Sequence, residues 1–322
     1  MNERINLTPP SMDEAPRQQR REKRDVNGWL VLDKPIGMTS THAVSVAKRL
    51  YSARRAGHAG TLDPLASGLL PIALGEATKT VPFVMDGRKV YQFTVRWGEE
   101  RDTDDAEGRV VATSAPRPSA EEIRALLPRF SGIIAQVPPR FSAIKVDGER
   151  AYDLARDGEV VELEARPVEI HRLSLVGITD PDHAVFSAEC GKGTYVRALA
   201  RDMGRLLGCY GHVSALRRTG VGPFGEQDGV SLERLQAAES SALIGLLKPV
   251  ADGLQGLPAI SVSRADAARL ARGQAVLLRG RDAPIVQGFM AVFTQGDLIA
   301  LAEGAEGELQ PRRIFNLNAR AV

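Results

Sequence analysis

The sequence contains little cysteine and no long apolar run. Its 322 residues include two cysteines, Cys190 and Cys209, which are too few for a disulfide framework and lack zinc-ligand spacing. We therefore expect reduced thiols and no structural metal. No run of about 18 apolar residues could span a bilayer, and the first residues, MNERINLTPPSMDEAP, lack the features of a signal peptide. The sequence predicts a cytoplasmic protein with no membrane segment.

An excess of charge of one sign is also missing. The 42 Lys/Arg and 40 Asp/Glu residues give a formal net charge of +2, which does not by itself indicate a nucleic-acid-binding protein. Residues 1–24 carry six basic and four acidic residues, and residues 257–322 carry eight and six, which leaves 28 and 30 between them. If the middle of the chain binds RNA, it must use a local basic face.

The chain is long enough for a large domain and a small one. Residues 1–25, with the run RQQRREKR, are predicted to form a disordered basic tail, for which solvation is favoured over phosphate binding. Residues 26–254 are predicted to form the main domain. After the Gly- and Pro-containing linker GLQGLPAI, residues 257–322 contain short apolar strands, Gly turns and one short helix around Ala265 to Leu270, which indicates a small β-rich domain.

Periodicity and capping residues predict the elements of the main domain. Its strands and helices mix without a regular βαβ repeat, which favours an α+β fold around a mixed, largely antiparallel sheet flanked by helices. The predicted strands are WLVLDKP, residues 90–95 with Val110 and Val111 as hairpin partner, 159–178 and 184–190. The predicted helices follow N-caps at Ser40 or Thr41, Ser119 and Thr194, and the last of them ends at Gly208.

Three stretches contain candidate functional residues. In GHAGTLDPLASGLLPIALGEATK, residues 57–79, an isolated Asp63-Pro64 pair would simply start a helix or turn. However, Gly57, Gly60 and Gly68 permit close backbone approach on both sides of Asp63, which suits a carboxylate presented to a bulky ligand in a cleft.

The second stretch is CGKGTYVRALARDMGRLLG, residues 190–208, which places arginines along one side of a helix. One interpretation is a solvent-exposed basic face. The other is that Arg197 pairs with a cleft carboxylate and the remaining arginines face phosphate; spacing alone does not decide between them. This second interpretation includes a basic face made of Lys48, Arg49, Arg54, Arg55, Arg201, Arg205, Arg217 and Arg218.

The third stretch, residues 88–108, contains Tyr91 on a predicted strand, as either a core tyrosine or a stacking platform. It also contains an acidic cluster. A calcium loop is excluded because Ala106 occupies the third ligand position and neither the glycine nor the terminal glutamate is in place. The cluster is instead interpreted as a solvated hairpin turn, and its members are Asp102, Asp104, Asp105 and Glu107.

These three stretches, in this order, resemble the TruB family of bacterial tRNA pseudouridine synthases, which act on the uridine at tRNA position 55. The resemblance continues through QVPPRFSAIKVDGERAYDLARDG and HVSALRRTGVGPF and covers residues 28–224. It implies the pseudouridine synthase fold and, for the segment around ELQPRRIFN, a PUA-like RNA-binding domain. It also implies a stand-alone, monomeric enzyme that binds the T-arm and T-loop of tRNA without guide RNA or cofactor.

The resemblance assigns roles residue by residue. Asp63 falls on the catalytic aspartate, Arg197 on its partner arginine and Tyr91 on the stacking tyrosine. Substrate contacts fall on four further residues, His58, Tyr195, Leu216 and Lys79.

The chemistry agrees with these residue types. Pseudouridine forms when an N-glycosidic bond breaks and the same base rejoins through C5. A carboxylate is a sufficient type of catalytic group for this reaction. Asp63 is expected to act as nucleophile or as base, with Arg197 stabilising its ionised form. Tyr91 would stack on the flipped base, and His58 would fill the space it leaves. A guide-dependent relative and an RNA chaperone are the alternatives.

Overall fold

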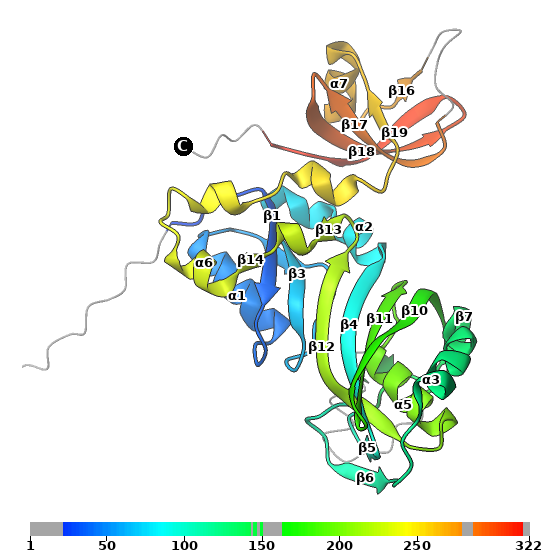
Figure 1. Cartoon of the computed structure of the whole chain (residues 1–322). Helices are drawn as coiled ribbons and strands as arrows, with labels where there is room; N and C mark the ends of the chain where they lie inside the picture. The colour runs from blue at the N-terminus through cyan, green and yellow to red at the C-terminus, as the bar shows by residue number, and fades with distance from the viewer. Residues whose placement is uncertain (1–21, 143, 147–148, 151–162, 279–285, 318–322) are drawn as a thin grey trace, which may run out of the picture.

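The computed structural model describes residues 22–142, 144–146, 149–150, 163–278 and 286–317. In this part of the chain, a large sheet and a small sheet lie toward opposite ends of an elongated molecule (Figure 1). Most of the predicted tail falls outside the described residues, as does much of the segment around residues 147–162 quoted for the resemblance. Within the described residues, Arg24 N–H donates to the Ser52 carbonyl, so backbone before Gly28 already belongs to the fold.

The large sheet is mixed and mainly antiparallel, as predicted. Its strand order is β14-β1-β3-β12-β4-β11-β10-β7, with β2 beside β3 and β13 beside β12 (Figure 1). Among the described strands of this large sheet, the β1–β14 and β3–β12 pairs are parallel and the other pairs are antiparallel. The strands are β1 (Gly28–Lys34), β2 (Ala56–His58), β3 (Ser67–Leu74), β4 (Lys89–Trp97), β7 (Gly132–Gln136), β10 (Arg166–Asp180), β11 (His183–Cys190), β12 (Gly211–Val221), β13 (Phe224–Gly225) and β14 (Val230–Ser231).

Alternating side chains of the strands form two separate hydrophobic clusters, one on each face of the sheet. Leu30 and Leu32 belong to the cluster that α1, α3 and α5 cover, whereas Trp29 and Val31 belong to the cluster covered by α2 and η5. The helices of this domain are α1 (Ser40–Leu50), α2 (Val81–Asp86), α3 (Ala120–Leu126), α5 (Val196–Leu206) and α6 (Leu232–Ala237), with single 3₁₀ turns η1 (Gly75–Lys79), η2 (Leu127–Phe130), η3 (Glu226–Asp228), η4 (Leu243–Leu246) and η5 (Val250–Leu254).

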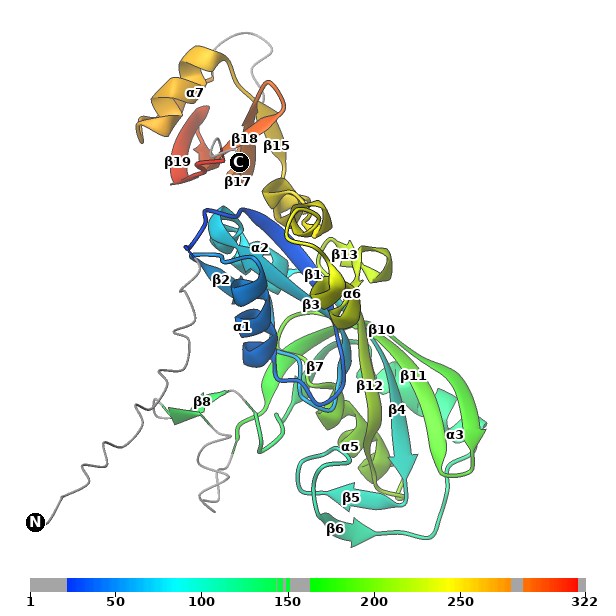
Figure 2. The same cartoon turned by 90° about the vertical axis from the view of Figure 1, so that its left-hand side faces the viewer.

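The small sheet follows a short connection and has the order β15-β17-β18-β19-β16. Its side chains Leu298, Leu301 and Phe315 join the same cluster as Trp29, so this sheet packs against the end of the main domain covered by α2 and η5 (Figure 2). The β-rich C-terminal region is thereby confirmed, and the limits 26–254 and 257–322 stay a prediction. Its elements are β15 (Ala259–Ser261), α7 (Arg264–Ala271), β16 (Val276–Leu277), β17 (Gly288–Thr294), β18 (Asp297–Ala305) and β19 (Glu308–Ile314).

Two hairpins lie outside these sheets, and one of them corrects a predicted pairing. Val110 and Val111 were expected to pair with residues 90–95, but β6 (Val110–Thr113) pairs with β5 (Glu99–Arg101). The reason is Gly98, whose φ of +95° turns the chain immediately after β4. Strand β4 is bounded instead by β11 and β12. The other hairpin joins β8 (Lys145–Val146) and β9 (Glu149–Arg150).

Two predicted N-caps are also wrong. Thr39 caps α1 by accepting from His42 N–H, since Ser40 points inward and exchanges hydrogen bonds with Leu62. At α5 the cap position is Tyr195 rather than Thr194, and its side chain makes no capping bond. In both places a tertiary contact decides the start of the helix, whereas the cap prediction used local sequence.

We expect Ser40→Ala to destabilise the protein by about 1–3 kcal/mol, because it leaves both backbone polar groups of buried Leu62 without a partner. Ser45→Ala, on the exposed side of the same helix, is the control and should cost under about 0.5 kcal/mol. Denaturant unfolding of both variants measures the difference. Equal free energies of unfolding for the two variants would show that the Ser40–Leu62 hydrogen bonds do not stabilise the protein.

Candidate active site

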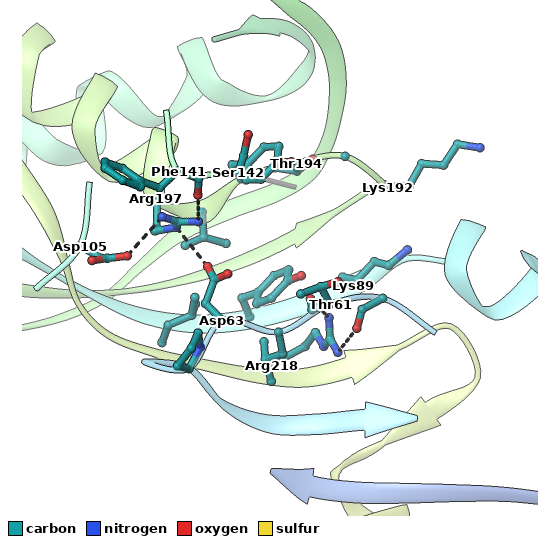
Figure 3. Close-up of a pocket in the computed structure, with 18 of the residues that line it drawn as sticks. Thr61, Asp63, Lys89, Asp105, Phe141, Ser142, Lys192, Thr194, Arg197 and Arg218 are labelled. Atoms are coloured by element: carbon teal, nitrogen blue, oxygen red, sulfur yellow. Dashed lines mark hydrogen bonds and ion pairs between the residues drawn. The ribbon is translucent and has the colours of Figure 1, made fainter. Parts of the chain in front are cut away.

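A cavity of about 610 Å³ opens beside the middle of the large sheet (Figure 3). It is lined by the β2–β3 loop, by strands β4 and β12, by the loop after β5, by residues 141–142 and by the loop that leads into α5. Five of the predicted site residues line this cavity, namely Asp63, Tyr91, Tyr195, Arg197 and Leu216. Segments far apart in the sequence therefore meet at one place.

The β2–β3 loop presents Asp63 from a tight turn. The Asp63 carbonyl accepts from Ala66 N–H at 3.1 Å, with Pro64 at the second position of the turn, so the Asp-Pro pair starts a turn rather than a helix. Gly68, at a φ of +101°, closes the loop where β3 meets β12. A Cβ on Gly68 would lie 2.2 Å from the Arg218 carbonyl oxygen, so this position requires glycine.

The Asp63 carboxylate is paired with Arg197 on the second residue of α5. Arg197 Nε lies 3.1 Å from Asp63 Oδ2, and the two outer nitrogens bind the Thr103 carbonyl at 3.0 Å, Asp105 Oδ2 at 3.3 Å and the Phe141 carbonyl at 3.0 Å (Figure 3). A planar fork of five N–H donors can serve these four acceptors together, which the single ammonium of lysine cannot do.

Burial of the pair is uneven. The Arg197 side chain is 8% exposed, whereas the Asp63 side chain is 37% exposed and faces the cavity. In the described part of the chain no other donor binds the Asp63 carboxylate. One carboxylate oxygen is thus held by a buried cation and the other is available to a ligand.

The acidic cluster lies in a hairpin turn between β5 and β6, as predicted, but only Glu107 of its four members is exposed. Asp104 and Asp105 are buried and form ion pairs with Arg201 and Arg197, two arginines one helical turn apart on α5. Burial raises the pKa of Asp104 to about 6, against the lowering effect of Arg201. At the cavity edge, burial and the nearby carboxylates raise the pKa of Glu107 above its ordinary value.

Strands β4 and β12 form one wall of the cavity. Tyr91 of β4 stands opposite Arg218 of β12 in the antiparallel register, and Leu216 of β12 also lines the cavity. Burial raises the pKa of the Tyr91 phenol, and the nearby charge of Arg218 offsets part of that rise. Tyr91 is half-buried, with part of its ring accessible from the cavity.

Tyr195 is held at the cavity by a residue that sequence reasoning missed. Gln136, at the end of β7, accepts from Tyr195 N–H at 2.9 Å and donates to the Tyr195 carbonyl at 3.2 Å. Gln136 is buried, and its amide satisfies backbone groups next to the start of α5. It stands at the head of the QVPPRF block, so the resemblance included it without indicating its role.

Lys79 and His58 do not line the cavity. The Lys79 ammonium binds Glu76 and the Ile314 carbonyl, both at 2.6 Å, and so links η1 to the small sheet. His58 lies on β2, its Nδ1 has no hydrogen-bond partner among the described residues, and burial with the nearby Arg218 charge lowers its pKa. Their substrate-contact roles stay predictions.

The predicted basic face is only partly present. Arg201 and Arg218 are buried, and Arg205 and Arg217 are paired with carboxylates, Arg217 with both Asp33 and Glu226. Four basic residues from α1 and the following loop remain exposed, namely Lys48, Arg49, Arg54 and Arg55, and Arg54 forms an exposed ion pair with Asp25. Among the described residues, no cluster of side chains has the composition of a metal site, and no helix is long and apolar enough to cross a membrane.

Comparison with known proteins accounts for this arrangement. The model of the TruB family pseudouridylate synthase N-terminal domain matches residues 48–196, and that of the tRNA pseudouridylate synthase B C-terminal domain matches residues 197–255. The tRNA pseudouridine synthase B of Bradyrhizobium diazoefficiens is 68% identical over 98% of this chain and 93% of its own length. The chain belongs to the TruB family.

A further relative agrees with this TruB assignment, and solved structures show the same fold. The tRNA pseudouridine synthase B of Rhodopseudomonas palustris is 70% identical over 92% of this chain and 83% of its own. A chain of a Cbf5-Nop10-Gar1 complex aligns at 24% identity over 90% of this chain and 85% of that chain, with a TM-score of 0.69. A chain of an H/ACA RNP bound to a substrate RNA aligns at 22% identity over 93% and 92%, with a TM-score of 0.70. These structures share the fold.

We expect Asp105→Asn to slow the chemical step of this TruB enzyme without changing tRNA affinity. Asn keeps the shape but removes the charge that balances Arg197, so Arg197 interacts more strongly with Asp63 and restrains its carboxylate. The loss of a charged hydrogen-bond partner costs about 1.5–3 kcal/mol, which corresponds to a roughly 10- to 100-fold lower single-turnover rate.

The control for Asp105→Asn is Asp202→Asn, which removes a carboxylate from Arg201 outside the cavity. Single-turnover pseudouridine formation and filter binding of tRNA measure both variants. A wild-type rate in Asp105→Asn would remove Asp105 from the catalytic network.

Proposed function

We propose that the protein is a tRNA pseudouridine synthase that isomerises uridine 55 in the T-loop. The proposal rests on the Asp63–Arg197 pair at the cavity surface, in a chain of the TruB family. The relatives named tRNA pseudouridine synthase B span nearly the whole chain, which supports tRNA as the substrate. The cavity volume of about 610 Å³ lies in the range of sites that take a small organic molecule, so it suits one extruded nucleoside.

Asp63 is the group that acts on the nucleotide. The N1–C1′ bond of the uridine breaks, the uracil turns, and a C5–C1′ bond forms, after which the C5 proton leaves. Asp63 attacks as a nucleophile or removes a ribose proton, and in both routes an ionised carboxylate is required. Arg197 pairs with that carboxylate and fixes its direction, because the guanidinium is itself immobilised by three other acceptors.

Tyr91 and Leu216 are proposed to hold the flipped base. Both side chains lie on adjacent strands that form the wall next to Asp63. An aromatic ring that is half-buried and backed by a rigid strand offers a stacking surface at low entropic cost. Tyr195, fixed by Gln136, stands at the same cavity and is proposed as a further substrate contact.

The remaining assignments extend the same proposal. The β-rich residues 257–322 are proposed as a PUA-like RNA-binding domain, with 26–254 as the catalytic domain, and the basic tail as a minor contributor to affinity. The enzyme is proposed to act as a cytoplasmic monomer on the T-arm without a guide RNA. The four exposed basic residues from the end of α1 and the following loop, beginning with Lys48, supply positive charge for the phosphate backbone.

We expect Asp63→Asn to abolish tritium release from tRNA labelled at uridine C5, because a neutral amide can serve neither as nucleophile nor as base. Affinity for tRNA should stay near the wild-type value. Turnover at the wild-type rate would contradict the assignment.

The same Asp63→Asn protein separates modification from RNA remodelling. If the protein is also a tRNA-folding chaperone, the inactive variant still accelerates refolding of a misfolded tRNA, followed by fluorescence. If it is an enzyme alone, the variant has no effect on the refolding rate.

We expect Tyr91→Ala to lower turnover roughly 10- to 100-fold, the loss of about 1–3 kcal/mol of base stacking. Tyr91→Phe is the matched control, since it keeps the ring and removes only the hydroxyl. Pseudouridine yield and thermal unfolding are measured for both. A folded and fully active Tyr91→Ala protein would mean that Tyr91 is an ordinary core tyrosine.

A further inference from the structure

Arg218 is a buried cation without a carboxylate partner. It is 1% exposed, and in the described part of the chain no carboxylate lies within ion-pair distance of its guanidinium group. The other buried arginines beside the site, Arg197 and Arg201, each bind at least one aspartate. Because burying an unpaired charge is costly, the position of Arg218 requires an explanation that packing does not supply.

The hydrogen bonds of Arg218 go to the backbone on both sides of the Asp63 loop. Its Nη2 donates to the Gly60 carbonyl at 3.1 Å, its Nη1 to the Thr61 carbonyl at 3.2 Å and its Nε to the Leu69 carbonyl at 2.9 Å (Figure 3). Gly60 and Thr61 lead into the turn that presents Asp63, and Leu69 lies on β3 beyond it. The positive φ of Gly60, +107°, allows two successive carbonyls to reach one guanidinium group.

Arg218 also belongs to the cavity wall that strands β4 and β12 form, next to Tyr91. Its backbone is paired in register with Tyr91, and its charge lowers the pKa of the Tyr91 phenol against the larger, raising effect of burial. Both Arg218 and Tyr91 line the cavity. Through its side chain and its strand pairing, Arg218 therefore connects the loop of the reacting carboxylate to the ring on which the base is proposed to stack.

The positive charge of Arg218 affects the pKa values of other groups around the site. It contributes to lowering the pKa of His58, and of Lys34 and Lys89, although burial is the larger cause for each of the three. Lys89 lines the cavity as well. The positive field of Arg218 thus extends over the base-binding side of the cavity, opposite the carboxylates around Arg197.

We infer that Arg218 is a positioning residue for the reaction: it holds Gly60 and Thr61, and through them Asp63, at a fixed distance from the Tyr91 ring. This inference rests on the proposed function. A planar fork is required because three carbonyls must be bound in fixed directions. The distance between the reacting carboxylate and the base is then set by one rigid group, and small errors in such distances cost much of the rate.

Arg218→Lys is the decisive variant, because it keeps the positive charge and loses the fork. We expect its single-turnover rate of pseudouridine formation to fall about 10²-fold, with tRNA affinity by filter binding near the wild-type value. Arg218→Met, which removes the charge as well, should fall further. Because the Arg218 charge lowers the pKa of His58, the His58 titration followed by NMR should move to higher pH in Arg218→Met and stay near the wild-type position in Arg218→Lys.

His212→Asn is the control for general destabilisation. His212 is buried on the same strand, binds the Glu99 carbonyl at 3.0 Å and lies away from the cavity. This variant should lower the melting temperature and leave the single-turnover rate of the folded protein unchanged.

Three results would overturn the inference: an Arg218→Lys rate near that of wild type, a loss of tRNA affinity as large as the loss of rate, or an Arg218→Lys protein that does not fold. Failure of the proposed function is distinguishable, since wild-type protein would then form no pseudouridine in the same assay. Wild-type activity with an unaffected Arg218→Lys variant would refute the positioning role and leave the proposed function standing.

Discussion

The arrangement of the cavity depends on one buried guanidinium group, that of Arg197. Removing this charge from water is tolerable because its donors meet two carboxylates and two carbonyls. The segments that supply these acceptors must therefore keep fixed places relative to α5. This constraint also fixes Asp63. One of its carboxylate oxygens is bound to a rigid cation, and the carboxylate remains open to the cavity.

The sheet supplies the second part of the site through its register. Strand β12 runs parallel to β3 at Gly68 and antiparallel to β4 at Tyr91, so the loop before β3 and the wall of β4 are brought to the same strand. Arg218 occupies that junction. Lys79, by contrast, belongs to a contact with the small sheet on the other face, where its ammonium binds the Ile314 carbonyl. The candidate RNA-binding domain is therefore attached through the same β3–η1 segment that follows the Asp63 loop.

Sequence reasoning succeeded where the signal is local and failed where partners are distant. Helix α3 was identified with its cap because Ser119 and Glu122 form a capping box within one turn. The role of Asp105 was missed because its partner Arg197 lies 92 positions away and nothing near Asp105 indicates burial. The predicted basic face failed for a related reason: α5 packs Arg201 against the acidic loop, and β12 turns Arg218 into the sheet.

The sequence by itself determined the family resemblance, the α+β class and the residue types able to act on a glycosidic bond, since these depend on ordered motifs and periodicity. Tertiary structure alone decided which charges are free and which are committed. Four residues that were interpreted as surface charges from the sequence are buried in the fold, namely Asp104, Asp105, Arg201 and Arg218. The energy of a charge depends on its distance from water and from its partner, and neither distance is encoded in any short stretch of sequence.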